Sequence, residues 1–180
     1  GNLIYCADRL REYFAEGEDL APDLARQAAQ LSDQGALREQ IERTLDDDGE
    51  VRRDASDELD RLYNRQAILE GRARDRMDSL MRQAAAGDVL QDPIIVQREG
   101  RFCLPVRSDR QSHLRGIVHD RSDSGATLFI EPFEIVEIGN ELREIASEIG
   151  AEIKRLLREL SAQVGAAGTD LLRDLDTLSF

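Results

Sequence analysis

The chain has 180 residues, of which 41% are hydrophobic, 34% are charged and only 4% are aromatic, with no tryptophan. So few aromatic side chains argue against a dense globular interior, while the charged fraction is typical of proteins built from long helices. The formal net charge of -13 disfavours tight, nonspecific attachment to nucleic acid or to an anionic membrane, because like charges repel.

The cysteines and the hydropathy of the chain indicate in which cellular compartment the protein is expected. Cys6 and Cys103 show neither metal-ligand spacing nor a disulfide framework, so we expect buried thiols in a reducing compartment. A signal peptide and a run of about 20 apolar residues are both missing, which predicts a soluble cytoplasmic protein without a membrane partner. Since the chain begins with Gly1 rather than Met and stops on apolar Phe180, we expect a piece of a longer protein.

Residues 1–54 predict a helical core segment. Residues 3–15 have apolar side chains at helical spacing, and Gly17–Pro22 is expected to end that helix. A second short helix is predicted between Pro22 and Gly35, because proline suits the first turn of a helix and glycine stops one. Residues 37–45 indicate a third short helix or an extended segment.

The acidic run Asp46–Gly49 resembles part of a calcium loop. The ligand alternation and the distal glutamate of such a loop are not met. A turn is therefore the preferred interpretation.

Two stretches with apolar residues at steps of three and four predict long helices, one outward within 55–90 and one returning within 132–164. At 1.5 Å per residue, a helix of roughly 30 residues is about 45 Å long. The similar length of the two stretches predicts an antiparallel, coiled-coil-like lever, and residues 165–180 predict the start of a returning core helix. The positions of the two repeats, apolar except for Gln66, are Leu59, Leu62, Gln66, Leu69, Ala73, Met77, Leu80 and Ala84, then Ile138, Leu142, Ile145, Ile149, Ile153, Leu156, Leu160 and Val164.

The period between the two helices changes to that of strands, which predicts a small antiparallel β domain over residues 91–131. One hairpin is expected from residues 94–96 and 101–106 around a tight turn at Glu99-Gly100. A second is expected from residues 114–119 and 126–131. The predicted fold class is therefore mainly α, with a helical core fragment and a long helical lever that has the β domain at its tip.

Polar residues of the second hairpin include the types used in catalysis and in metal binding. His119, Asp120, Ser122 and Ser124 are those of a hydrolytic triad, but neighbouring strand residues point to opposite faces and no G-x-S-x-G elbow is present. His113 and His119, six residues apart on a strand-like segment, offer no converging metal geometry. Turn chemistry explains the serines and aspartates better, so neither a catalytic nor a metal site is predicted.

The β domain is electrically different from the rest of the chain. Residues 92–131 hold six arginines and six acidic residues, so the whole net charge lies elsewhere. Arginines beside exposed serines and glycines are suited to phosphate contacts, although a solvated outer sheet face is the competing interpretation. The predicted nucleic-acid-binding residues are Arg98, Arg101, Arg107, Arg110, His113, Arg115 and Arg121.

Several short motifs resemble the MutS type II family, the second bacterial MutS paralogue family. The resemblance extends more loosely over nearly the whole chain. The motifs are Asp48–Val51 (DGEV), Asp54–Ser56 (DAS), Asp92–Ile94 (DPI), Gly100–Phe102 (GRF), Leu104–Arg107 (LPVR), Gly116–Asp120 (GIVHD), Ser122–Pro132 (SDSGATLFIEP) and Asn140–Leu142 (NEL).

The resemblance implies part of a helical core, an antiparallel lever and a clamp at its tip. Full-length members of the family pair two such arms in a homodimer that closes around nucleic acid, with an ATPase domain that uses ATP and Mg²⁺ and a nuclease-type domain. Their proposed substrates are branched DNA, in suppressing recombination, and the rRNA of stalled or collided ribosomes. The sequence has no G-x-x-x-x-G-K-[ST] loop, so neither catalysis nor a cofactor is expected in this chain.

A binding and mechanical module is therefore the expected function. The alternative is a coiled-coil arm for protein interaction or dimerisation, whose β tip binds protein. Salt dependence of binding separates the two, because neutralising phosphates makes affinity fall steeply with salt.

Overall fold

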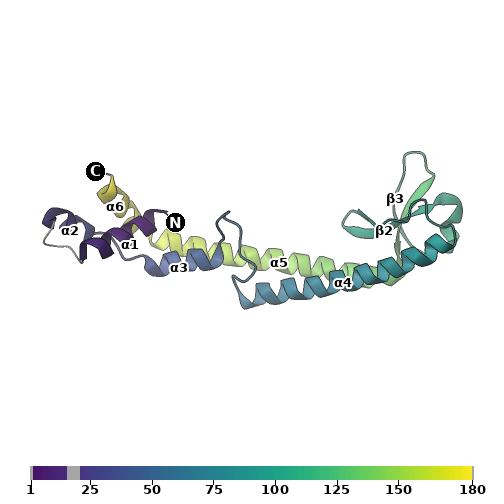
Figure 1. Cartoon of the computed structure of the whole chain (residues 1–180), viewed down its shortest axis with the longest axis horizontal. Coiled ribbons are helices and arrows are strands. Elements are labelled where there is room, and N and C mark those ends of the chain that lie inside the picture. The colour runs from purple at the N-terminus through teal and green to yellow at the C-terminus, as the bar shows by residue number, and fades with distance from the viewer. Residues whose placement is uncertain (1, 16–20, 180) are drawn as a thin grey trace. The chain divides into compact units, whose positions relative to one another are not determined.

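A computed structural model describes residues 2–15 and 21–179 of the chain. Helices make up most of these residues, with one small antiparallel sheet (Figure 1). The expected mainly helical fold with a small β part is confirmed. The chain divides into two compact units, Gly1–Asp60 with Ala151–Phe180, and Arg61–Gly150. Of the expected break at Gly17–Pro22, residues 17–20 lie outside the described residues.

The first unit contains four short helices: α1 (Asn2–Ala15), α2 (Pro22–Ala28), α3 (Gly35–Thr44) and α6 (Gly168–Leu178). Helix α1 packs against each of the other three. Asp174 of α6 is 1% exposed, and its carboxylate accepts hydrogen bonds from the backbone N–H of Ser32, at 2.9 Å, and from the Ser32 hydroxyl. This contact fixes α6 to the connection between α2 and α3.

A tight turn follows α3, as the acidic run predicted. The Asp46 carboxylate accepts hydrogen bonds from the backbone N–H groups of Asp48 and Glu50, at 3.1 and 2.9 Å. Gly49 has a φ of 84°, in the region that glycine adopts without strain. Leu45 then pairs with Val51 in an isolated antiparallel bridge. The acidic side chains thus have a local role in shaping the turn.

Two long helices, α4 (Asp57–Ala86) and α5 (Phe133–Ala166), account for the apolar repeats. They run antiparallel: Ser56, just before α4, meets Glu152, while Arg65 pairs with Glu141 and Arg76 with Glu134 (Figure 1). Every apolar residue of the first repeat is buried, and the second repeat is buried at four positions. Those four are Ile145, Ile149, Leu156 and Leu160.

The two ends of α5 depart from the expected repeat. Val164 is 38% exposed, so the buried face of α5 ends before it. Ile135, which the repeat did not include, is completely buried. It belongs to the core of the second unit, where it packs with residues of α4 and of the sheet.

The sheet has four antiparallel strands in the order β1-β2-β4-β3. Their bounds are β1 Val96–Arg98, β2 Arg101–Arg107, β3 Gly116–Arg121 and β4 Thr127–Pro132. The turn between β1 and β2 has positive φ at both Glu99 (50°) and Gly100 (73°), as the tight hairpin required. One face of the sheet packs on the C-terminal end of α4 and on Ile135.

The strand boundaries near the second hairpin differ from those expected. A short 3-10 helix, η1 (Ser108–His113), occupies the approach to β3, so β3 begins at Gly116 rather than Leu114. Pro132 ends β4 instead of beginning the helix, and α5 starts at Phe133. In both places the hydrogen-bonding partner strand decides the boundary, and the order of residues alone does not reveal it.

The two cysteines have different environments. Cys103 is completely buried, and burial raises the pKa of its thiol to about 11, with a smaller contribution from Glu131. Cys6 is exposed, so the expectation that both thiols are buried is wrong for this residue. Cys6 lies on a solvent-facing side of α1, because only Ile4 and Ala7 of that helix are buried. Among the described residues, no helix combines the length and the apolar character needed to cross a bilayer.

Candidate nucleic-acid interface

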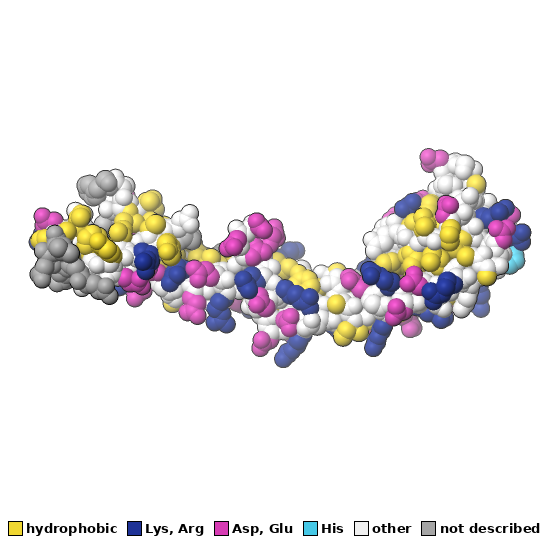
Figure 2. Space-filling model, viewed as in Figure 1, with side chains coloured by type: hydrophobic (Ala, Val, Ile, Leu, Met, Phe, Trp, Pro, Cys, Tyr) yellow, Lys and Arg dark blue, Asp and Glu magenta, His cyan; other side chains and the backbone are white. Residues whose placement is uncertain are grey.

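The seven basic residues predicted to contact nucleic acid all belong to the unit that contains the sheet. Figure 2 shows basic and acidic side chains intermixed around that unit. Local charge pairing therefore decides which of the seven are available. They lie on β1 (Arg98), on β2 (Arg101 and Arg107), on η1 (Arg110 and His113), just before β3 (Arg115) and at its end (Arg121).

Arg101 is held inside a buried polar network. Its side chain is 12% exposed, and its guanidinium donates to the Glu131 carboxylate at 3.2 Å and to the Asn140 side chain at 2.7 Å. The second Glu131 oxygen lies 2.7 Å from Nε2 of His119, and Glu131 is only 1% exposed. These four residues, the Glu131 network, join β2, β3, β4 and α5. The contacts give Arg101 a structural role.

A β-bulge places His119 in this network. Val118 pairs with Ile130 and Asp120 with Phe129, which leaves His119 as the extra residue of β3. A bulge turns a side chain away from the regular alternation of a strand. Asp120 instead pairs with Arg98 at 3.2 Å. The histidine and aspartate types that suggested a triad thus have separate partners.

Ser122 and Ser124 belong to the turn between β3 and β4. The Ser122 hydroxyl accepts a hydrogen bond from the backbone N–H of Thr127 at 3.1 Å, and the Ser124 hydroxyl accepts one from Ala126 at 3.4 Å. Gly125 has a φ of 72°. These contacts match the turn chemistry that the sequence favoured over catalysis.

Two glycines leave room for Glu131 and its partners: Gly116, the first residue of the GIVHD motif, and Gly139, just before the NEL motif. A Cβ atom on Gly139 would lie 2.9 Å from Nη1 of Arg101 and 3.0 Å from a Glu131 carboxylate oxygen. A Cβ atom on Gly116 would overlap the Glu131 backbone carbonyl. Several of the most recognisable motif residues therefore build the junction between the sheet and α5, and a direct contact with a ligand is not needed to explain them.

Three further arginines have acidic partners at the surface. Arg98 pairs with Asp120, and its guanidinium lies 4.1 Å from the centroid of the Phe129 ring. Arg107 lies 3.5 Å from the Asp88 carboxylate and 3.4 Å from that of Asp109, which is also 3.8 Å from Arg110. A phosphate would have to compete with these carboxylates.

His113, Arg115 and Arg121 form the remaining group, which we call the free basic residues. All three are exposed, and within residues 2–15 and 21–179 no carboxylate lies within ion-pair distance of their side chains. Arg115 and Arg121 are at opposite ends of β3, about 20 Å apart at 3.3 Å per residue. They are therefore suited to different positions along an extended anion.

A groove lined by Arg115 contains an aromatic side chain that sequence reasoning missed. The groove has a volume of about 580 Å³ and lies among η1, the start of β3 and the first residue of α5. Phe133 lines it and is 51% exposed. The two phenylalanines within the strands, Phe102 of β2 and Phe129 of β4, are by contrast partly buried. A bulky apolar residue directly after Pro132, where the returning helix was expected to begin, was the available signal.

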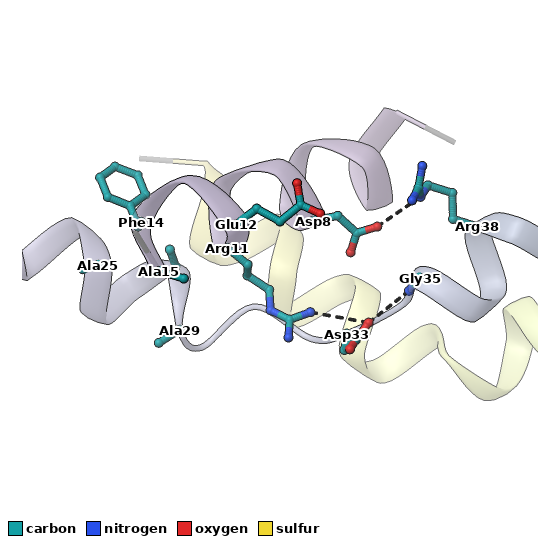
Figure 3. Close-up of a pocket in the computed structure, with 11 residues that line it drawn as sticks. Asp8, Arg11, Glu12, Phe14, Ala15, Ala25, Ala29, Asp33, Gly35 and Arg38 are labelled. Atoms are coloured by element: carbon teal, nitrogen blue, oxygen red, sulfur yellow. Dashed lines mark hydrogen bonds and ion pairs between the residues drawn. The ribbon is translucent and has the colours of Figure 1, made fainter. Parts of the chain in front are cut away.

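A second hollow, of about 590 Å³, lies in the helical unit among α1, α2 and α3 (Figure 3). Its charged side chains neutralise one another: Arg38 contacts Asp8 at 3.1 Å, and Arg11 contacts Asp33 at 3.5 Å. The Gly35 backbone N–H, together with Arg11, lowers the pKa of Asp33. Glu12 also lines the hollow and pairs with Arg9 at 3.2 Å, while Phe14 and several alanines form most of the remaining wall. Among the residues that the structure describes, the hollow therefore offers no unpaired charge to a ligand.

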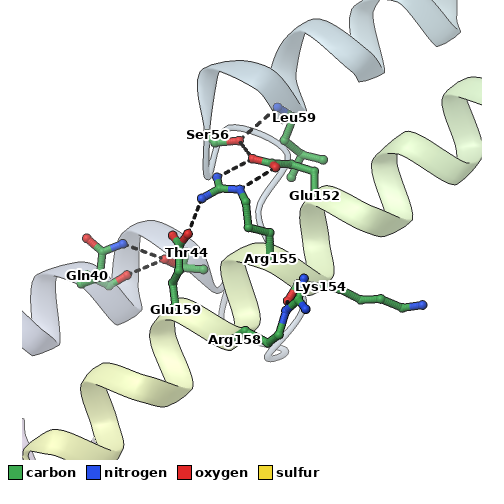
Figure 4. A network of polar contacts seen from close by, with 9 residues as sticks. All are labelled: Gln40, Thr44, Ser56, Leu59, Glu152, Lys154, Arg155, Arg158 and Glu159. Carbon is green, nitrogen blue, oxygen red and sulfur yellow. Dashed lines mark hydrogen bonds and ion pairs between the residues drawn. The ribbon is translucent and has the colours of Figure 1, made fainter.

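The start of α4 is fixed to α5 by a polar network (Figure 4). The Ser56 hydroxyl accepts a hydrogen bond from the Leu59 backbone N–H at 3.1 Å, which caps the helix, and donates one to Glu152 at 2.7 Å. Arg155 donates to Glu152 and to Glu159. The hydrogen bonds from Arg155, and then that from Ser56, lower the pKa of Glu152 to about 2.

Glu152 is expected to make this unit less stable in acid. Because its pKa in the fold lies below the ordinary value of 4.5, the carboxylate stabilises the fold fully above that value and loses the effect as the pH falls towards 2. Since the Arg155 side chain is 45% exposed, we discount the effect for solvent screening and expect about 1–2 kcal/mol. Urea unfolding of the wild type and of Glu152→Gln should differ by this amount at pH 7 and converge near pH 2. The exposed Glu148→Gln is the control, and an equal gap between wild type and Glu152→Gln at every pH would contradict the assignment.

Comparison with known proteins identifies the family. No protein-family model matches the chain. Endonuclease MutS2 of Symbiobacterium thermophilum is 41% identical over 162 residues, covering 87% of this chain and 20% of the relative. Endonuclease MutS2 of Geobacillus thermodenitrificans is 44% identical over 133 residues (74% and 17%), and putative endonuclease MutS2 of Bacillus subtilis is 37% identical over 158 residues (86% and 20%). The chain thus spans at most about a fifth of the length of these relatives. The resemblance seen in the motifs is confirmed, and the chain belongs to the MutS2 family.

Proposed function

We propose that this chain is the nucleic-acid-gripping part of a MutS2 protein, with the small sheet and η1 as the clamp. The observation that carries the proposal is the set of free basic residues on the clamp, in a chain whose net charge is -13. Because no carboxylate occupies them, the exposed guanidinium groups of Arg115 and Arg121 are available to a phosphate, which arginine binds through its forked hydrogen bonds. The relatives named as endonucleases support nucleic acid as that partner.

Helices α4 and α5 are proposed to form the lever that moves this clamp. They are 30 and 34 residues long, antiparallel, and each contributes residues to both units. The Glu131 network fixes the sheet to α5, and Arg143 of α5 donates to the Glu99 carbonyl at 2.7 Å, which fixes the hairpin turn as well. A sheet attached this firmly to a helix moves with it as one body.

The substrate is proposed to be branched DNA or the structured rRNA of a stalled ribosome, gripped by a homodimer in the cytoplasm. ATP and Mg²⁺ belong elsewhere in the whole protein. The sequence has no phosphate-cradling loop, and within the described residues no group of three or more His, Cys, Asp or Glu side chains is arranged so that it could hold a metal ion.

Charge reversal at the clamp tests the proposal. The variant Arg115→Glu with Arg121→Glu is expected to lower the affinity of the 180-residue chain for a four-way DNA junction about tenfold or more, because two phosphate contacts are lost. The slope of log affinity against log salt should become shallower by about 2. Filter binding or fluorescence anisotropy at 50 and 200 mM salt, on the junction and on a structured RNA, gives both quantities.

A matched control separates the site from net charge. Arg72→Glu with Arg74→Glu changes the charge equally at two exposed residues of α4, outside the strands and η1, and should weaken binding much less. Equal effects of the two double variants would contradict the clamp assignment. A protein-binding tip is the second candidate, favoured by exposed Ile117 and Val118 on β3. If the tip binds protein instead, neither double variant should change the affinity for nucleic acid.

A further inference from the structure

Phe133, the first residue of α5, places a large apolar side chain at the groove beside η1. This side chain is 51% exposed. Its backbone N–H donates to the Arg115 carbonyl at 3.2 Å, which fixes the start of α5 against the residue before β3. The half-exposed ring is therefore attached to a fixed stretch of backbone, where a ligand in the groove can reach it.

The groove beside Phe133 combines a cation with neutral polar groups. The Arg115 guanidinium lies 6.0 Å from the centroid of the Phe133 ring and is one of the free basic residues. On the side formed by η1, the groove is lined by Ser108, Gln111 and Ser112. Asp109 also lines the groove, but Arg107 and Arg110 neutralise its carboxylate. The groove thus offers a flat ring, an unpaired positive charge and an amide.

We propose that this groove takes one unpaired nucleobase, stacked on Phe133, with the adjoining phosphate on Arg115. The inference rests on the proposed function and adds the kind of structure that is recognised. Stacking is available to every base and so does not depend on sequence, while the Gln111 amide can both donate to and accept from a base edge. The volume of about 580 Å³ lies in the range of ordinary ligand sites.

Charge and access both favour this occupant. The unpaired Arg115 complements a phosphate, whereas an apolar protein segment would leave its charge without a partner. A base inside a continuous duplex is stacked on both faces, so only a base that is bulged, looped or at a branch point exposes a face to Phe133. The groove thereby gives the clamp a preference for interrupted duplexes over continuous ones.

A bulged duplex tests the inference. The probe is a DNA duplex with one bulged 2-aminopurine, compared with the same duplex fully paired. Wild-type chain is expected to bind the bulged duplex more tightly and to change the 2-aminopurine fluorescence. Phe133→Leu should lower affinity for the bulged duplex roughly fivefold to a hundredfold and leave the paired duplex unchanged. Phe133→Trp, which keeps a stacking ring, should retain the preference.

Controls distinguish this inference from the proposed function. Tyr13→Leu removes an aromatic ring that is 72% exposed in the other unit and should change neither affinity. Thermal melting should show that Phe133→Leu folds. The Arg115→Glu, Arg121→Glu variant could bind both duplexes more weakly while Phe133→Leu still prefers the bulged duplex as the wild type does. That result would contradict the stacking site and support the clamp. If the wild type does not prefer the bulge, the stacking site is also overturned. If it binds neither duplex, both proposals fail.

Discussion

Leu69→Asp is expected to lower the stability of the helix pair by about 3–5 kcal/mol, because it removes a buried leucine and places a carboxylate among apolar side chains. Leu69 is 5% exposed on α4. Ile149→Asp on α5, at a residue that is 8% exposed, should have a similar effect. In circular dichroism at 222 nm, each variant is expected to melt about 10 °C below the wild type, at roughly 2–4 °C per kcal/mol for a chain of this length.

The neighbouring residue provides a matched control. Ile68 is 58% exposed, so Ile68→Asp makes the same kind of substitution on the outer side of the same helical turn. Surface substitutions of this kind change stability by about 0.5 kcal/mol or less. Equal melting temperatures of Leu69→Asp and Ile68→Asp would show that the apolar repeats of α4 and α5 are not packed together in solution.

Glu131→Ala is expected to destabilise the sheet unit by about 3–5 kcal/mol, because it leaves Arg101 buried without its carboxylate. His119 loses its 2.7 Å partner in the same variant. Glu131→Gln keeps the shape of the side chain and a hydrogen-bond acceptor, so this variant should lose less stability than Glu131→Ala. Urea unfolding, with amide hydrogen exchange to localise the change to β2, β4 and the start of α5, measures both effects.

A double-mutant cycle identifies the coupling. Arg101→Met removes the charge that would otherwise be left unpaired. The double variant Arg101→Met with Glu131→Gln should therefore lose less stability than the sum of the losses in the two single variants. Glu137→Gln, at an exposed position of α5, is the control and should behave as the wild type. Additive single losses, or a Glu131→Ala variant as stable as Glu137→Gln, would contradict a coupled buried pair.

The long helices and the first hairpin were predictable because their signals are local. Burial at Leu59, Leu69 and Met77 follows from a step of three or four along one chain segment. The positive φ of Gly100 follows likewise from a two-residue turn between apolar runs. The bulge at His119 has no comparable signal, since it depends on how β3 pairs with β4.

The sequence by itself determined two amphipathic helices on either side of a small β domain, and it also determined the family resemblance. Both follow from patterns of residues that are close together in the chain. Only the tertiary structure decided which arginines of that domain have carboxylate partners. Arg107 meets Asp88, Arg98 meets Asp120 and Arg101 meets Glu131, pairs separated by 19 to 30 positions in the sequence. The exposed ring of Phe133 likewise results from folding, because the same residue type is partly buried at position 102. Charge pairing and exposure depend on which residues are neighbours in space. Residues of the same type therefore stabilise the fold at one position and are available for binding at another.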